Sequence, residues 1–358
     1  MKLSVVFLLA VCIASCDGKR NGEQTAGAQA LTIASWNVQA LFDGEERGNE
    51  YKEYSSDAGW NKEKYQTRLT AIAGAINQMV EGGPDMLALI EIENAQVIGD
   101  LLAGSLAQSG YRWTFFGTNP GYSLGLGIIS KVPFTQTRLH SMNTAGEVIP
   151  RPIVEVRINK DDHPVVLFIC HWKSKLNGET EYLRRAAARV LRRRIREIES
   201  EDPSIPVLIM GDLNENYDEF YRNNGAIVTA LLPDDPDAAE KVSQDSGRAA
   251  DFLVISNCKP PIPQYFDSDF ALYSPWGNEL SDGSYSYKNQ WETIDHILLS
   301  SAFFDDAGWD FTACSVINKA PFANQAGFPF MYNARTGNGL SDHLPLLLKL
   351  GIKNRPDL

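Results

Sequence analysis

The feature that most constrains the fold of this chain is residues 206–216, PVLIMGDLNEN. The unbroken apolar run at 207–210 predicts a strand that is buried on both faces. Asp212 and Asn214 follow two positions apart, and in extended chain such residues point to the same side. The stretch therefore predicts a carboxylate and a carboxamide side by side at the exposed end of a buried strand. This pair suits Mg²⁺, Ca²⁺ or Mn²⁺, although a polar turn after a strand has the same composition.

The same pattern recurs along the chain. Other apolar runs also end in a single polar residue, and the last run, at 344–350, is preceded by two. These residues, in chain order, are Asn37, Glu91, His171, Asp295, Asp342 and His343. Between the early runs, apolar residues recur at helical spacing at 65–79, 95–109 and 178–200. No linker divides residues 31–352, so we expect one domain in which sheet packs on sheet with helices outside.

The helix expected at 178–200 carries many arginines on the face opposite its apolar residues. A basic helix face is able to meet phosphate groups, but Glu197, Glu199 and Glu201 lie beside these arginines. We therefore expect this face to be solvated rather than to bind a ligand.

Residues 1–15 have the pattern of a signal peptide. Lys2 precedes an apolar run at 3–13 that is too short to cross a bilayer. The small residues before Cys16 resemble the lipobox of bacterial lipoproteins, in which the chain is cut before the Cys and its thiol carries lipid; an ordinary secretory signal is the alternative. Residues 16–30 predict a flexible polar tether. We therefore expect an exported protein, lipid-anchored in the cell envelope on its periplasmic or surface side, with the membrane as a partner and no protein partner inferred.

Composition and missing motifs count against several function classes. A formal net charge of -12 counts against a DNA-binding module, because phosphate backbones attract clustered Lys and Arg. The chain has no Walker loop and no GxSxG motif, which argues against nucleotide-driven phosphotransfer and a serine hydrolase. A zinc site made by His171 and His343 is a weaker alternative without HExxH or HxH. Three cysteines follow the signal, and the sequence leaves open whether Cys258 and Cys314 form a disulfide.

The polar residues at the strand ends are the types that phosphate-ester hydrolysis requires. A divalent cation held by Glu and Asp neutralises the charge of the transition state and orients the phosphate. A His paired with an Asp takes a proton from water, while a second His or an Asn donates hydrogen bonds to phosphate oxygens. The sequence therefore predicts a metal-dependent hydrolytic site.

Six short motifs resemble the endonuclease/exonuclease/phosphatase superfamily, whose members include deoxyribonuclease I-like nucleases. They are SWNV at 35–38, LIEIE at 89–93, HWKS at 171–174, GDLN at 211–214, IDHI at 294–297 and SDH at 341–343. The resemblance implies an α/β fold: a four-layer α/β/β/α sandwich of two mixed β-sheets packed face to face with helices outside.

The resemblance also implies a role for each motif residue. The metal ligands would be Glu91, Asn37 and Asp342. Strand geometry, rather than the resemblance, adds Glu93 as a secondary candidate, because it shares a side with Glu91 if that strand is extended. His343 would act as general base, oriented by Asp295. Asp212 would orient the attacking water or serve the metal site. Asn214 and His171 would bind the phosphate, and His171 would stabilise the transition state. The cofactor would be a divalent cation, Mg²⁺ first, with Mn²⁺ or Ca²⁺ as alternatives.

Within this superfamily the sequence favours a secreted or surface phosphodiesterase, a nuclease that acts on nucleic acid. HWKS at 171–174 resembles the His-bearing members of the superfamily. The alternative is a phosphatase on phosphorylated inositols, sugars or lipids, including a sphingomyelinase-like enzyme, because small substrates need no basic groove. A third hypothesis is a catalytically inactive, lipid-tethered binding protein. The loss of a motif residue would favour it, but all of them are present.

Overall fold

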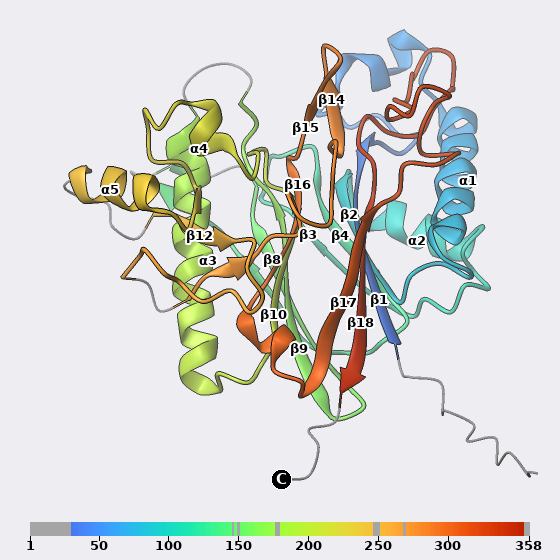
Figure 1. The fold of residues 1–358 in the computed structure, drawn as a ribbon. Coiled ribbons are helices and arrows are strands. Elements are labelled where there is room, and N and C mark those ends of the chain that lie inside the picture. The colour runs from blue at the N-terminus through green and yellow to red at the C-terminus, as the bar shows by residue number, and fades with distance from the viewer. Residues whose placement is uncertain are drawn as a thin grey trace, which may run out of the picture.

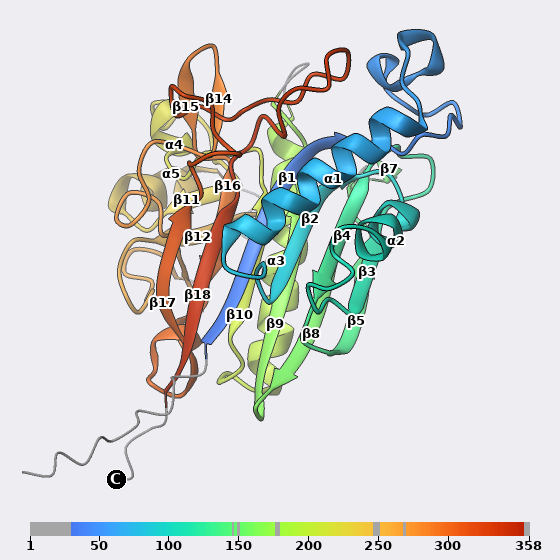
Figure 2. The ribbon, with the colours of Figure 1, turned by 90° about the vertical axis from the view of Figure 1, so that its right-hand side faces the viewer.

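The computed structural model describes residues 30–353 apart from 145–146, 149–150, 176–179, 246–250 and 268–269. The expected signal peptide, most of the tether and Cys16 lie outside the described residues. Two β-sheets make up the centre of the molecule, and each is mixed in strand direction (Figures 1 and 2).

The first sheet has the strand order β17-β18-β1-β2-β4-β3. β1 and β2 are parallel, and the other neighbours in this sheet are antiparallel. Its strands are β1 (Ala30–Leu41), β2 (Met86–Ile92), β3 (Trp113–Gly117), β4 (Gly125–Ser130), β17 (Gly308–Val316) and β18 (Leu346–Lys353).

The second sheet has the order β11-β12-β13-β16-β10-β9-β8-β5. β9 and β10 are parallel, whereas β16 runs antiparallel to β10. Its strands are β5 (Phe134–His140), β8 (Ile153–Lys160), β9 (His163–His171), β10 (Val207–Asp212), β11 (Leu231–Pro233), β12 (Leu253–Ser256), β13 (Leu272–Tyr273) and β16 (Asp295–Leu299). Two small hairpins stand apart: β6 (Asn143–Thr144) with β7 (Glu147–Val148), and β14 (Tyr285–Tyr287) with β15 (Gln290–Glu292).

Helices cover the outer faces of both sheets, as Figure 2 shows for α1 and α2 in front of the first sheet. The helices are α1 (Lys62–Met79), α2 (Ala95–Ala103), α3 (Glu181–Glu201), α4 (Glu219–Arg222) and α5 (Pro236–Gln244), and short 3₁₀ turns lie at Lys52–Tyr54, Ser56–Ala58 and Ser301–Phe304. Asn61 caps α1 by accepting hydrogen bonds from the backbone N–H groups of Glu63 and Lys64. The four-layer α/β/β/α sandwich expected from the sequence is therefore confirmed.

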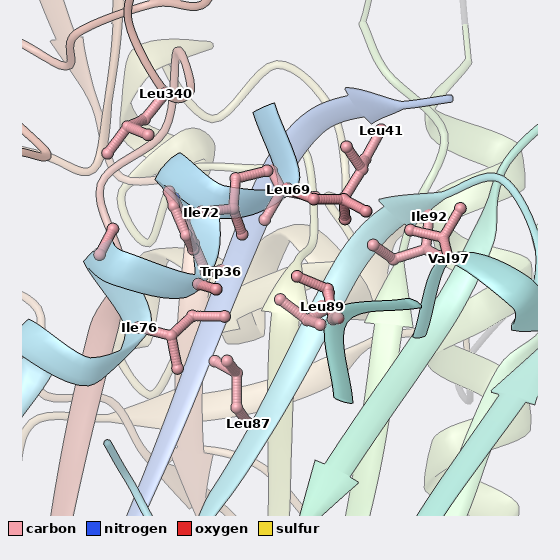
Figure 3. Close-up of a cluster of buried hydrophobic side chains, with 14 of the residues drawn as sticks. Trp36, Leu41, Leu69, Ile72, Ile76, Leu87, Leu89, Ile92, Val97 and Leu340 are labelled. Carbon is pink, nitrogen blue, oxygen red and sulfur yellow. The ribbon is translucent and has the colours of Figure 1, made fainter. Parts of the chain in front are cut away.

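The alternation of side chains along β2 explains why its run is continuously apolar. Leu87 and Leu89 face Ile72 and Ile76 of α1 in one buried cluster (Figure 3). Ala88 and its neighbours of the same parity face the second sheet, in a cluster that contains Leu167 of β9 and Leu208 of β10. A third cluster joins the outer face of the second sheet to the apolar face of α3. A strand between two apolar layers has no polar face.

The arginine face of α3 differs from the solvated face that the sequence predicts. Arg194 is 6% exposed and binds Glu155 of β8 through Nε at 2.9 Å and Nη2 at 3.1 Å. Arg184 is 4% exposed, and its Nε is 3.1 Å from the buried carboxylate of Glu215. Both arginines are buried because buried carboxylates, one on β8 and one in the loop after β10, compensate their charge. Much of this helix face is therefore structural.

Two further findings concern the described part of the chain. None of its helices combines the length and the apolar character that crossing a membrane requires. Cys170 and Cys314 are buried free thiols, and Cys258 is an exposed free thiol. The possible Cys258–Cys314 disulfide is therefore not formed.

Candidate active site

The topology brings the predicted polar residues to one edge of the two sheets. Parallel strands end at the same edge, so β1 and β2 deliver Asn37 and Glu91 there, and β9 and β10 deliver His171 and Asp212. The antiparallel strands β16 and β18 begin at that edge. Asp295 therefore pairs with Asp212 between β16 and β10. Asp342 and His343 lie a few residues before the start of β18. An apolar run can thus carry its polar residue at either end, depending on its direction.

The end of β10 has a backbone that admits only glycine at one position. Gly211 has φ of 133°, and a Cβ there would lie 2.0 Å from the carbonyl oxygen of Cys170. After this close approach, the Asp212 carboxylate accepts a hydrogen bond from the N–H of Asn214 at 2.9 Å. Asn214 has φ of 51° and donates its Nδ2 to the carbonyl of Trp172 at 3.1 Å. The side chains of Asp212 and Asn214 are thereby both held at the sheet edge.

A cleft of about 470 Å³ opens at this edge. It is lined by the predicted residues Glu91, His171, Asp212, Asn214, Asp342 and His343, together with Tyr51, Arg151, Lys173, Ser174, Lys175, Tyr285, Tyr287, Glu292 and Ile294. Asn37 and Asp295 lie just beneath, each bound to a lining residue. The structure therefore brings together all eight residues predicted for the site.

Glu93, the secondary metal candidate, does not join this group. Its carboxylate accepts a hydrogen bond from the N–H of Asp43 at 2.7 Å and binds Arg47 Nη1 at 3.1 Å. The expected alternation fails because Glu91 has φ of 69°, in the left-handed region, so the strand is not extended there. A residue two positions on therefore points elsewhere, and the prediction that Glu93 shares a side with Glu91 is wrong.

His343 and Asp295 form a buried pair. The Nδ1 atom of His343 lies 2.8 Å from Asp295 Oδ2, which also accepts a hydrogen bond from Ser284 Oγ at 2.6 Å. Burial opposes a charge on His343, but Asp295, Asp342 and Asp212 together raise the pKa of its imidazole well above the usual value. The loop before β18, which carries His343, is fixed to β1, because Trp36 Nε1 donates a hydrogen bond to the carbonyl of His343 at 3.0 Å.

Carboxylates from both sheets meet across the cleft. Asn37 Nδ2 donates to Glu91 Oε1 at 3.2 Å and to Asp212 Oδ2 at 3.1 Å, so one carboxamide links the two sheets. Burial raises the pKa of Asp212 to about 7, and nearby Asp295 adds to the rise while His343 opposes it. Burial also raises the pKa of Asp342. Burial thus disfavours the ionised form of both carboxyl groups, so added positive charge would stabilise them as carboxylates.

His171 has the opposite electrostatics from His343. Burial, followed by the positive charge of Arg151, lowers the pKa of His171 well below its usual value. Its Nε2 lies 3.4 Å from Asp212 Oδ2 and 3.7 Å from Glu91 Oε1. A neutral imidazole here has one ring nitrogen able to donate a hydrogen bond.

Sequence reasoning missed several residues of this site. Ser284 binds Asp295, but it lies in a polar loop with no pattern that would have singled it out. Arg151 lines the cleft, and its surroundings are equally uninformative. The sequence could have singled out Arg68, because it is a lone charged residue on the apolar face of α1, four residues before Ile72. Its side chain is 1% exposed.

A four-layer sandwich with Asp, Glu, Asn and His gathered at one sheet edge is the arrangement of a phosphoester hydrolase. The chain belongs to the Endonuclease/Exonuclease/phosphatase family, whose pattern matches residues 32–232. No curated protein sequence matches the chain.

Solved structures with low sequence identity share the fold. ANGEL2, a 2′,3′-cyclic phosphatase, superimposes with a TM-score of 0.55 at 14% identity, covering 91% of this chain and 96% of that chain. Truncated TDP2 of Caenorhabditis elegans gives 0.51 at 15% identity, covering 90% and 97%. An endonuclease/exonuclease/phosphatase family protein of Bacteroides thetaiotaomicron gives 0.51 at 14% identity, covering 91% and 99%.

Proposed function

We propose that this protein is a metal-dependent phosphodiesterase, and specifically a nuclease, in which His343 and Asp295 activate water. One observation carries the proposal. His343 is bound through Nδ1 to the buried Asp295, and its Nε2 lies 4.0 Å from Asp212 Oδ2, within the cleft that Glu91 also lines. A base, its orienting carboxylate and an acidic cation site therefore share one cleft.

The donor atoms fit a hard divalent cation. Among residues 30–353, leaving out the undescribed segments, no three His, Cys, Asp or Glu side chains converge to hold a metal by themselves. Mg²⁺ does not need such a cage, because it keeps several waters and uses one or two carboxylates together with substrate phosphate. The residues that would hold it are Glu91, Asn37 and Asp342, with Mn²⁺ or Ca²⁺ as alternatives. When bound, the cation would neutralise charge on the phosphate.

The residues of the cleft supply the remaining steps. In its neutral form, His343 takes a proton from a water that Asp212 orients, and Asp295 stabilises the resulting imidazolium. A bound cation would favour the neutral form, because it would offset the carboxylates that raise the pKa of His343. The water oxygen bonds to phosphorus and the ester P–O bond breaks. The leaving oxygen takes a proton from solvent water and departs as an alcohol, and the His343 imidazolium returns its proton to solvent. Asn214 and neutral His171 donate hydrogen bonds to the phosphate oxygens as negative charge develops there.

The test is turnover of DNA and RNA by the purified protein with Mg²⁺ or Mn²⁺, which EDTA should abolish. His343→Ala should lower kcat by at least about a hundredfold, the contribution expected of a general base. His163→Ala is the matched control, because His163 begins β9 at the end opposite His171. Near-normal activity of His343→Ala, with the fold intact by circular dichroism, would contradict the mechanism.

The second candidate is a phosphatase on phosphorylated inositols, sugars or lipids. The net charge of -12 favours the phosphatase, because a small substrate does not require the broad basic surface that binds a polynucleotide. A panel of DNA, RNA, inositol phosphates and sphingomyelin under one metal condition separates the two. Turnover confined to the small phosphate esters would replace the nuclease with the phosphatase.

We also propose that residues 1–15 direct export and that Cys16 carries a lipid anchor, with residues 16–30 as the tether. The support is the pattern of small residues before Cys16. In cells, the protein should sediment with membranes, and Cys16→Ala should release it into the soluble fraction. A wild-type protein that is already soluble would contradict the anchor.

A further inference from the structure

Two cations of the cleft have no role in the steps above. Arg151 and Lys173 line it beside His171, Asp212 and Asn214. Arg151 lies just before β8, and Lys173 follows the end of β9 by two residues. Both therefore come from the second sheet, whereas Glu91 comes from the first. The second sheet therefore places two cations in the cleft beside the carboxylate of Asp212.

Arg151 is held next to a residue assigned to the scissile phosphate. Its Nη1 donates to the carbonyl oxygen of Trp172, which also accepts the Nδ2 of Asn214 at 3.1 Å. One carbonyl therefore fixes both a guanidinium and the carboxamide of Asn214. An anion bound by the guanidinium would lie beside the phosphate bound by Asn214.

The charges of Arg151 and Lys173 lack carboxylate partners. Within the described part of the chain, neither side chain forms an ion pair with Asp or Glu, whereas the third cation of the cleft, Lys175, binds Glu219 at 2.8 Å and Glu292 at 3.2 Å. Burial, followed by the charge of Arg151, lowers the pKa of Lys173. Two like charges held together are unfavourable, and a bound anion would offset that cost.

We propose that Arg151 and Lys173 form a subsite for a second phosphate, adjacent to the scissile phosphate ester, and that the enzyme therefore prefers substrates with two neighbouring phosphates. This inference rests on the proposed function. A guanidinium binds phosphate oxygens through two parallel N–H groups, and an ammonium adds a point charge. Two kinds of substrate present two neighbouring phosphates: an oligonucleotide with an adjacent phosphate, and an inositol or sugar with two phosphates.

The test compares the wild type with the double variant Arg151→Gln/Lys173→Gln. Arg193→Gln is the control for lost positive charge, because the Arg193 side chain is 73% exposed on α3. The substrates are dithymidylate with and without a 5′-phosphate, and inositol bisphosphate against inositol monophosphate. We expect the wild type to prefer the member with two phosphates and the double variant to lose about tenfold or more of that preference, mainly in KM. Arg193→Gln should keep it.

Each outcome decides the inference. A preference in the nucleotide pair identifies an oligonucleotide as the source, and one in the inositol pair identifies a polyphosphorylated small molecule. Absence of preference in both pairs, or a preference that the double variant retains, overturns the subsite. If the double variant fails to fold by circular dichroism, Lys173→Gln carries the same comparison.

Failure of the proposed function would be recognised separately. If the wild type hydrolyses none of these esters, the hydrolase proposal fails, and the subsite is tested by binding alone. Fluorescein-labelled 5′-phosphorylated dithymidylate in EDTA should then bind the wild type about tenfold more tightly than the double variant in an anisotropy titration. Equal binding would overturn the subsite.

Discussion

Arg68 is the buried residue whose replacement tests most directly how the fold supports the cleft. Its guanidinium donates to three consecutive carbonyls at the end of β1: Val38 at 2.7 Å, Gln39, and Ala40 at 2.9 Å. Gln39 and Ala40 have φ of 55° and 51°. In this turned backbone, the N–H of Ala40 donates to Glu91 Oε2 at 2.7 Å. Arg68 thereby holds the backbone that holds Glu91.

The structure gives a magnitude for Arg68→Met, which keeps length and apolar bulk but removes every donor. Two buried carbonyls and the part-buried carbonyl of Gln39 would lose their partner, at about 1 to 3 kcal/mol each. Part of this loss is offset, because the protein no longer desolvates the guanidinium, a cost visible in the pKa of Arg68, which burial lowers. We expect the free energy of unfolding to fall by about 3 to 5 kcal/mol.

Two measurements check this prediction. Urea unfolding followed by tryptophan fluorescence gives the stability, with Arg193→Met as an exposed control that should change it by no more than about 0.5 kcal/mol. If Arg68→Met remains folded, calorimetric titration with Mn²⁺ should show affinity weakened by about ten- to a hundredfold, as expected when a partner of a metal ligand is disturbed. A stability loss below about 1 kcal/mol together with unchanged Mn²⁺ affinity would refute the reasoning.

Two further predictions concern the buried carboxylates of Asp295 and Glu155. Asp295→Asn can keep an oxygen facing both His343 and Ser284 but loses the charge that stabilises the imidazolium, so kcat should fall by about a hundredfold or more at similar KM; a loss below tenfold in steady-state assays would contradict the pairing. Burial alone would raise the pKa of Glu155, but hydrogen bonds from His140 and Arg194 lower it well below its usual value. Its folded pKa is thus below its unfolded pKa, so its stabilisation is present above about pH 4.3 and lost as pH falls toward the folded pKa. Glu155→Gln should cost about 1.5 to 3 kcal/mol at pH 7 and flatten the acid loss seen in urea unfolding from pH 5 to 3; an unchanged acid slope would contradict it.

The sequence by itself indicated the central strands that are buried on both faces and the polar residue at the end of each, but not the edge strands β5 and β17. These are local properties, because apolar runs and period-two alternation are read from neighbouring residues. Asp212 and Asn214 lie at the end of a buried strand as predicted. Glu91, His171 and His343 line the same cleft, and Asn37 binds Glu91 there. The parallel and antiparallel directions of the strands then required that these ends meet.

Only the tertiary structure decided which polar side chains turn into that cleft. Glu93 points away from the cleft because the backbone of Glu91 is left-handed. Arg194 and Arg184 of α3 are buried because each binds a buried carboxylate, of Glu155 on β8 and of Glu215 after β10. Arg151 and Asn214 share the carbonyl of Trp172, although 63 positions separate them in the sequence. Such partners come from distant segments and leave no periodic trace, so their role depends on how two sheets and their helices close around one edge.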